Sequence, residues 1–133
     1  MPESRSPFAY TVVRAVPRVE RGEFINVGVV LFCRERRFLG ARIGLDGARL
    51  SALEPECDAA EIRAQLEAIV RVAEGSADAG PIARLSQSER FHWISSPHST
   101  IIQRSEAHTG LTDDPAATLE HLFRALVLAP LST

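Results

Sequence analysis

Lysine is absent from this sequence, because all fifteen basic residues among its 133 are arginines. Without a lysine amine the chain cannot form a Schiff base, a Walker-type phosphate-binding loop or a Ser-x-x-Lys nucleophile. Such uniform use of arginine is better explained by the codon preference of a GC-rich genome than by selection for guanidinium geometry. The absence therefore excludes several enzyme mechanisms, but it assigns no role to any one arginine.

Cysteine is scarce and long apolar runs are missing. The two cysteines, Cys33 and Cys57, lie in contexts typical of a strand end and a loop, and no segment like a signal peptide precedes them. The longest apolar run, FINVGVVLFC at 24–33, has about half the length that a membrane helix needs. We therefore expect reduced thiols, a cytoplasmic location and no membrane segment.

The charge of the chain is low and mixed, with a formal net charge of −2 at pH 7. Nucleic-acid-binding proteins usually carry a basic surface, and the densest basic stretch here is only RERR at 34–37. The apolar fraction of 45% and the charged fraction of 24% are those of an ordinary globular domain. Composition thus argues against nucleic-acid binding and against disorder.

Signatures of metal, cofactor and acyl-transfer chemistry are missing as well. The intervals between the four histidines do not match the tight spacing of zinc ligands. The glycines of GARIGLDG do not follow the dinucleotide-binding pattern, and the sequence has no Gly-x-Ser-x-Gly elbow. We therefore predict no metal site, no cofactor and no catalytic triad.

What the sequence does contain is a succession of strand-like segments. Segments 8–16, 24–33 and 38–44 are rich in β-branched, aromatic or alternating apolar residues, and turns at Gly22 and at RERR separate them. They predict a three-stranded antiparallel meander. Alternation in the second strand predicts one buried face, formed by Ile25, Val27, Val29, Leu31 and Cys33.

Two helices are predicted together with their ends. Segment 58–75 has an apolar stripe at helical spacing, with Asp58 as its N-cap and Gly75 as the left-handed residue that ends it. A second helix begins at Pro115, directly after the cap Asp114. Residues 45–57, by contrast, have no regular pattern.

A hairpin is predicted between these helices, where RFHWIS at 90–95 and STIIQRS at 99–105 have strand-like composition. Its turn would span 95–99, with His98 at the tip. Strands thus precede and follow a helix without regular alternation. The sequence predicts an α+β fold, in which an antiparallel sheet made of the N-terminal meander and this later hairpin packs with at least two α-helices. Residues 8–128 would form a single domain, between a flexible leader at 1–7 and a C-terminal tail at 129–133.

Five polar residues are candidates for a ligand-binding site: Arg14, Asn26, Arg90, His92 and His108. Alternation in the predicted hairpin puts Phe91 and Trp93 in the core and turns Arg90 and His92 to the opposite face. There, near Thr100 or Arg104 of the facing strand, they would form a cationic patch able to hold a carboxylate or a phosphate. The site would be a pocket between the hairpin and the first sheet.

The two candidate arginines also have a purely structural interpretation. An arginine on an apolar strand face needs an acidic partner, and one at a sheet edge can be satisfied in the same way. Acidic residues are available for both: Glu20 or Glu23 for Arg14, and Glu89 or Glu106 for Arg90. Either interpretation fits the sequence.

Several long strings in order resemble a bacterial family known as domain of unknown function 3037 (DUF3037). They are YTVVRAVP, RGEFINVGVVLFC, GPIARLSQSERFHWISSPHSTIIQ and HTGLTDDP, and the resemblance spans about residues 8–127. It implies a small stand-alone bacterial protein with no assigned activity, no known cofactor and no catalytic residues. It also implies a gene often found beside that of a HipA-like kinase.

Two hypotheses of different classes follow. The first is a non-catalytic interaction or accessory module that binds a protein partner, a HipA-like kinase being the partner that the resemblance suggests. The second is an anion-binding protein or an enzyme that uses Arg90, His92 and His108, and it requires these side chains to converge on one site within hydrogen-bond reach. Convergence is therefore the geometric test.

Overall fold

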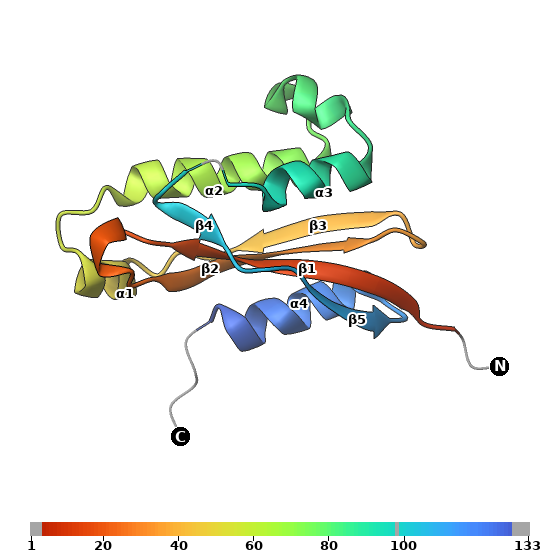
Figure 1. Ribbon diagram of the computed structural model, residues 1–133, viewed down its shortest axis with the longest axis horizontal. Helices are drawn as coiled ribbons and strands as arrows, with labels where there is room; N and C mark the ends of the chain where they lie inside the picture. The colour runs from red at the N-terminus through yellow and green to blue at the C-terminus, as the bar shows by residue number, and fades with distance from the viewer. Residues whose placement is uncertain (1–3, 98, 129–133) are drawn as a thin grey trace.

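A computed structural model describes residues 4–97 and 99–128 of the chain, and its centre is an antiparallel sheet. The sheet has five strands in the order β3-β2-β1-β4, with β5 also paired to β1. The strands are β1 (Ser6–Ala15), β2 (Ile25–Cys33), β3 (Phe38–Ile43), β4 (Ile102–Arg104) and β5 (His108–Thr112). β4 and β5 lie one after the other along the same edge of β1, as Figure 1 shows.

Helices cover both faces of this sheet. They are α1 (Gly47–Leu53), α2 (Ala59–Glu74), α3 (Gln87–Ser95) and α4 (Pro115–Leu126), with short 3₁₀ turns η1 (Val19–Arg21), η2 (Ala77–Ala79) and η3 (Pro81–Arg84). In Figure 1, α2 and α3 lie on one face and α4 on the other. Each face has its own buried apolar cluster. The fold is α+β, as predicted.

The N-terminal meander and two predicted helices are confirmed, with their ends. β1, β2 and β3 pair in sequence order, and β1 begins at Ser6, two residues before the predicted strand. The Asp58 carboxylate accepts the Glu61 N–H at the start of α2, and Gly75 ends that helix with φ 70°. Asp114 caps α4 in the same manner. The predicted turn-tip His98, the tail 129–133 and the first three residues of the predicted leader lie outside the described residues.

The five apolar residues of β2 that were predicted to be buried are buried, but the prediction that they share one face is wrong because a bulge interrupts the strand. Val13 pairs with Gly28, but the next residue, Arg14, pairs with Asn26, so Val27 is left without a partner on β1. One extra residue reverses the alternation. As a result Ile25 and Val27 pack in the cluster under α2 and α3, whereas Val29, Leu31 and Cys33 pack in the cluster under α4.

The predicted hairpin at 90–105 is also wrong, because RFHWIS is helical and forms most of α3. A capping box begins this helix: the Ser86 hydroxyl accepts the Glu89 N–H, and the Glu89 carboxylate accepts the Ser86 N–H. The second half of the prediction does contain a strand, β4, but its partner is β1. Aromatic and β-branched composition was outweighed by a local helix-start signal.

Residues 45–57, which show no pattern in the sequence, contain the short helix α1. The Asp46 carboxylate caps it by accepting the N–H groups of Ala48 and Arg49. Leu50 is the one residue of this helix that is buried, and it packs into the cluster under α2. A seven-residue helix with one buried side chain leaves too short a periodicity to detect.

The capping box gives α3 a pH dependence with a defined sign. The Ser86 N–H, and next the Ser86 hydroxyl, lower the pKa of the Glu89 carboxyl from its ordinary value. A lowered pKa means that the carboxylate stabilises the fold above the ordinary glutamate pKa, and that this contribution is lost as pH falls through the lowered value. We expect the urea midpoint of the wild type to exceed that of Glu89→Gln near pH 6, and the difference to shrink toward about pH 3. A difference that stays constant with pH would contradict this account.

Candidate functional site

Arg90, the central candidate of the sequence, lies at the C-terminal end of α2. Its Nη1 donates to the carbonyl oxygens of Val72 at 2.9 Å and Ala73 at 2.8 Å, and its Nε donates to the Leu85 carbonyl at 3.0 Å. These carbonyls are among those that a helix end or a turn leaves without an intrahelical partner. Arg90 therefore joins α2 to α3, and carbonyl oxygens rather than Glu89 or Glu106 satisfy it.

The two candidate histidines lie on opposite sides of the sheet. His92 is exposed on α3, where it lines a shallow surface hollow. His108 is exposed on β5, opposite Tyr10 of β1, with the two ring centroids 5.3 Å apart on the face that α4 covers. Arg90, His92 and His108 therefore do not converge on one site.

Arg14 and Asn26, in contrast, are brought together as cross-strand partners of β1 and β2. The Arg14 guanidinium lies 4.4 Å from the centroid of the Phe24 ring, and Asn26 Nδ2 donates to the Leu126 carbonyl at the end of α4. Arg14 Nε and Asn26 Oδ1 are buried and have no hydrogen-bond partner. These two residues lie beside the end of α4, far along the sheet from His108.

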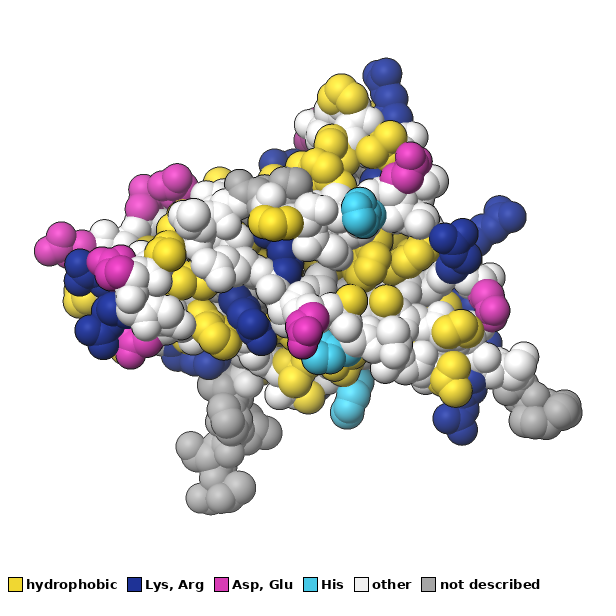
Figure 2. All heavy atoms as spheres, viewed as in Figure 1, with side chains coloured by type: hydrophobic (Ala, Val, Ile, Leu, Met, Phe, Trp, Pro, Cys, Tyr) yellow, Lys and Arg dark blue, Asp and Glu magenta, His cyan; other side chains and the backbone are white. Residues whose placement is uncertain are grey.

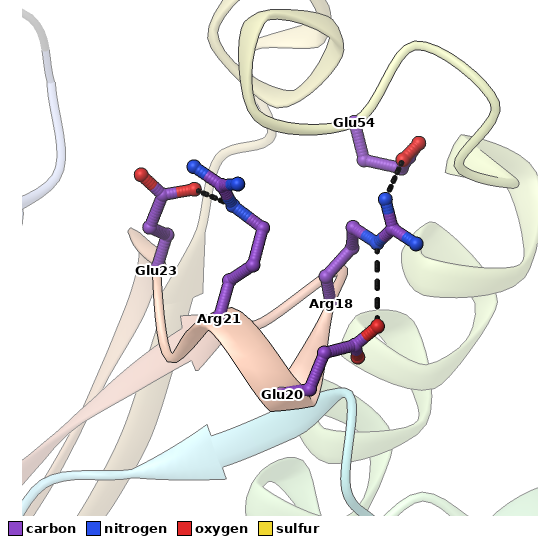
Figure 3. Close-up of polar contacts among 5 residues, drawn as sticks. All are labelled: Arg18, Glu20, Arg21, Glu23 and Glu54. Atoms are coloured by element: carbon purple, nitrogen blue, oxygen red, sulfur yellow. Dashed lines mark hydrogen bonds and ion pairs between the residues drawn. The ribbon is translucent and has the colours of Figure 1, made fainter.

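The predicted acidic partners of Arg14 are bound elsewhere. In the turn after β1, Glu20 lies 3.5 Å from Arg18, and Glu23 accepts from Arg21 at 2.7 Å. Figure 3 shows these pairs, together with the contact between Arg18 and Glu54. Because Arg14 lies over Phe24 instead, a cation–π contact replaces the expected ion pair.

A different arginine, Arg104 at the end of β4, is the most unusual polar group among the described residues. It faces the layer of α2 and α3, since its strand partner Val13 belongs to that cluster. Among the described residues, Arg104 Nε is buried without a hydrogen-bond partner, and Nη1 donates to the Ile102 carbonyl at 3.2 Å. Burial lowers the pKa of its guanidinium. Across residues 4–97 and 99–128, no carboxylate forms an ion pair with it.

Arg104 stands between two lobes of a surface pocket, which we call the Arg104 pocket. The first lobe, of about 160 Å³, is mainly apolar and is lined by Ala68 and Ile69 of α2, Trp93 of α3 and Ile102 of β4. The second, of about 300 Å³, is more polar than the first, and we call it the polar lobe; its lining includes Ser95, Ser99, Thr100 and Gln103 beside Pro97 and Ile102. Ser95 Oγ is also buried without a hydrogen-bond partner. Among the described residues, Arg104 Nε and Ser95 Oγ thus lie buried beside the pocket without a partner, next to an apolar surface.

The signal for Arg104 was present in the sequence but was misinterpreted. Ile102 and Arg104 are two apart in a strand, so an apolar residue and a charge share one face. In the predicted hairpin this charge would have faced Arg90 and His92 at a solvated surface. Because β4 pairs with β1 instead, the same face lies beneath α2 and α3.

The second notable surface is the end of the sheet at which Pro7, Thr109 and Leu111 are exposed. We call it the open face, and it consists of Pro7, Ala9, Phe32, Thr109 and Leu111. Register places these residues of β1 and β5 on the same side as α2 and α3, but α2 lies over the other half of the sheet and α3 contacts the sheet at β2 and β3 (Figure 1). Leu111 is 62% exposed, the highest value among the large hydrophobic residues that the structure describes.

The open face continues to α3. The Phe32 and Phe91 rings stack with centroids 5.5 Å apart. The Arg34 guanidinium, just after β2, donates to the Ser88 hydroxyl of α3. A hollow of about 320 Å³ lies on the sheet side, lined mainly by apolar atoms. Figure 2 shows hydrophobic side chains gathered here, with arginine and histidine side chains around them.

The described ranges hold neither a group of metal ligands nor a helix that could span a membrane. No three His, Cys, Asp or Glu side chains among residues 4–97 and 99–128 are grouped so that they could hold a metal ion. None of the helices in those ranges combines the length and apolar character needed to span a bilayer. Cys33 and Cys57 are both free thiols, and burial raises the pKa of Cys57.

The structure is thus a small α+β fold with a pocket at Arg104 and an exposed apolar sheet end, in which Arg90, His92 and His108 do not converge. Comparison with protein families identifies the family: residues 10–127 match the family described as "Protein of unknown function (DUF3037)". Since the match covers most of the chain, the protein belongs to the DUF3037 family, as the sequence resemblance predicted. No match was found among curated proteins or among solved structures.

Proposed function

We propose that this protein is a non-catalytic interaction module that binds a protein partner through the open face. The partner we propose is a HipA-like kinase encoded beside it, and the place of action is the bacterial cytoplasm. The observation that carries the proposal is the open face, where Leu111 is 62% exposed and pairs with Pro7, which lines the same hollow as Phe32. Contiguous exposed apolar surface of this kind typically marks a protein-binding site.

The arrangement of the other polar residues supports a role in binding. Arg90 is occupied in joining two helices, and His92 and His108 lie on opposite faces of the sheet. General acid–base or nucleophilic catalysis needs groups within hydrogen-bond reach of each other. The anion-binding alternative keeps its support at another residue, Arg104.

The proposed interface can be tested with one substitution and a matched control. Leu111→Glu places a charge at the most exposed apolar residue of the open face and should weaken binding to the kinase at least tenfold, because burial of a lone carboxylate is costly. Val19→Glu, 47% exposed at the opposite end of the sheet, should leave binding unchanged. Binding is measured by co-purification and by calorimetry with the purified kinase.

Both variants change exposed side chains, so both should unfold at the same temperature as the wild type within about 2 °C. A kinase that binds wild type and Leu111→Glu equally well would refute the interface. A kinase that does not bind the wild type, and whose activity is unaffected by it, would refute the choice of partner.

A further inference from the structure

We propose that the Arg104 pocket binds a small monocarboxylate that carries an apolar group of about the size of a phenyl ring. A guanidinium is always charged, and a buried charge is normally paired with an opposite charge. Arg104 is partly buried, its Nε has no partner, and no described carboxylate reaches it. The missing counter-charge is what a ligand would supply.

The charge count favours a carboxylate over a phosphate. The other side chains that line the polar lobe are neutral, among them Ser95, Ser99, Thr100 and Gln103. One guanidinium balances a single negative charge, whereas a phosphate monoester carries about 1.5 to 2 at neutral pH. A carboxylate can also accept two parallel hydrogen bonds from a guanidinium. The unpartnered Ser95 hydroxyl is a further donor at the same lobe.

The apolar lobe defines the rest of the ligand. Its volume of about 160 Å³ is close to that of an engineered apolar cavity of about 150 Å³ that holds benzene. Ala68, Ile69 and Ile102 supply aliphatic surface, and Trp93 supplies an aromatic ring. Because the two lobes share Arg104, a ligand with a carboxylate one or two bonds from a ring can occupy both. Phenylacetate has this shape and is the probe we choose.

The experiment uses the only tryptophan of the chain, Trp93, as a reporter within the pocket. The full-length protein is titrated with phenylacetate while tryptophan fluorescence is followed, and calorimetry measures the affinity. We expect a saturable change with a dissociation constant in the millimolar range or below. The neutral analogue 2-phenylethanol and inorganic phosphate should each bind at least tenfold more weakly, because one lacks the charge and the other lacks the ring.

Two variants and a control locate the site. Arg104→Gln should weaken phenylacetate binding at least tenfold, and Ala68→Phe should block it by filling the apolar lobe. Arg63→Gln removes the same charge from an exposed position on α2 and should not change the affinity. If Arg104→Gln fails to fold, the comparison of phenylacetate with 2-phenylethanol on the wild type still tests the role of the charge.

Three results would each overturn the proposal. They are the absence of a saturable change up to about 10 mM phenylacetate, equal binding of the neutral alcohol, and displacement of phenylacetate by equimolar inorganic phosphate. The open face and the Arg104 pocket consist of different residues. Loss of kinase binding in Leu111→Glu and loss of phenylacetate binding in Arg104→Gln are therefore independent outcomes.

Discussion

Replacing Phe123 with alanine is expected to lower the free energy of unfolding by about 3–5 kcal/mol. Phe123 is 4% exposed and belongs to the cluster that joins α4 to the sheet. A Cβ at Gly44 would lie 2.9 Å from the Phe123 ring, so the ring already fills the space that this glycine leaves. The Arg42 guanidinium covers the ring from outside, 4.5 Å from its centroid.

The size of this effect follows from how little the surroundings can collapse. The ring is enclosed by backbone on the Gly44 side and by the neighbouring side chains of α4, so its removal leaves a cavity as well as a loss of apolar burial. The melting temperature should fall by about 10–20 °C. His121→Ala, an exposed change on the same helix, should have little effect. A loss below about 1 kcal/mol for Phe123→Ala would show that α4 is not packed as described.

Replacing Arg90 with methionine is expected to lower the free energy of unfolding by about 2–3 kcal/mol. Methionine keeps much of the aliphatic stem but removes all three hydrogen bonds to the carbonyls of Val72, Ala73 and Leu85. The Val72 and Ala73 bonds are partly buried, so water replaces them only in part. The loss should be visible in urea unfolding and as earlier hydrogen exchange in the last turn of α2.

Arg90→Lys separates charge from geometry. A lysine ammonium keeps the charge but has no planar fork that can reach three carbonyls from one position. We therefore expect Arg90→Lys to lose most of the stability that Arg90→Met loses. Arg84→Met, at an exposed position of η3, is the matched control and should be nearly neutral. If Arg90→Lys were as stable as the wild type, charge alone would explain the role of Arg90.

The role of Arg90 also changes the functional interpretation of α3. With Arg90 turned toward α2, the outward side of α3 is left with His92, Ser88 and Glu89, next to the open face. Of the polar residues in RFHWIS, Arg90 therefore takes part in helix packing, whereas His92 lies on the surface. A catalytic role for Arg90 would require its guanidinium to give up its hydrogen bonds to three carbonyls. The stability lost in Arg90→Met measures what the loss of those bonds costs.

Elements with local signals were predicted correctly from the sequence. Asp58, Gly75 and Asp114 specify helix ends because a cap acts within three or four residues. The strands of the meander are adjacent in sequence, and the turns between them are short, so pairing of neighbours is the default. Family membership was likewise predicted from long strings in order.

Elements that depend on distant partners were not predicted correctly. RFHWIS has strand composition but also follows Ser86, and the capping box with Glu89 outweighed that composition once α3 could pack on α2 and Phe32. β4 pairs with β1 across almost the whole chain, which no local pattern specifies. The bulge at Val27 divides one alternating strand between two cores, and an alternation pattern alone does not contain it.

The candidate site shows the same difference between features set by nearby residues and features set by distant ones. The sequence by itself determined the residue types, the absence of lysine chemistry, the helix ends and the family. Only the tertiary structure decided that Arg90 is bound by carbonyls, that His92 and His108 are separated by the sheet, and that Arg104 is partly buried without a counter-charge. The physical reason is that caps and strand propensity act over a few residues, whereas the burial of a charge depends on which distant strand pairs with its own.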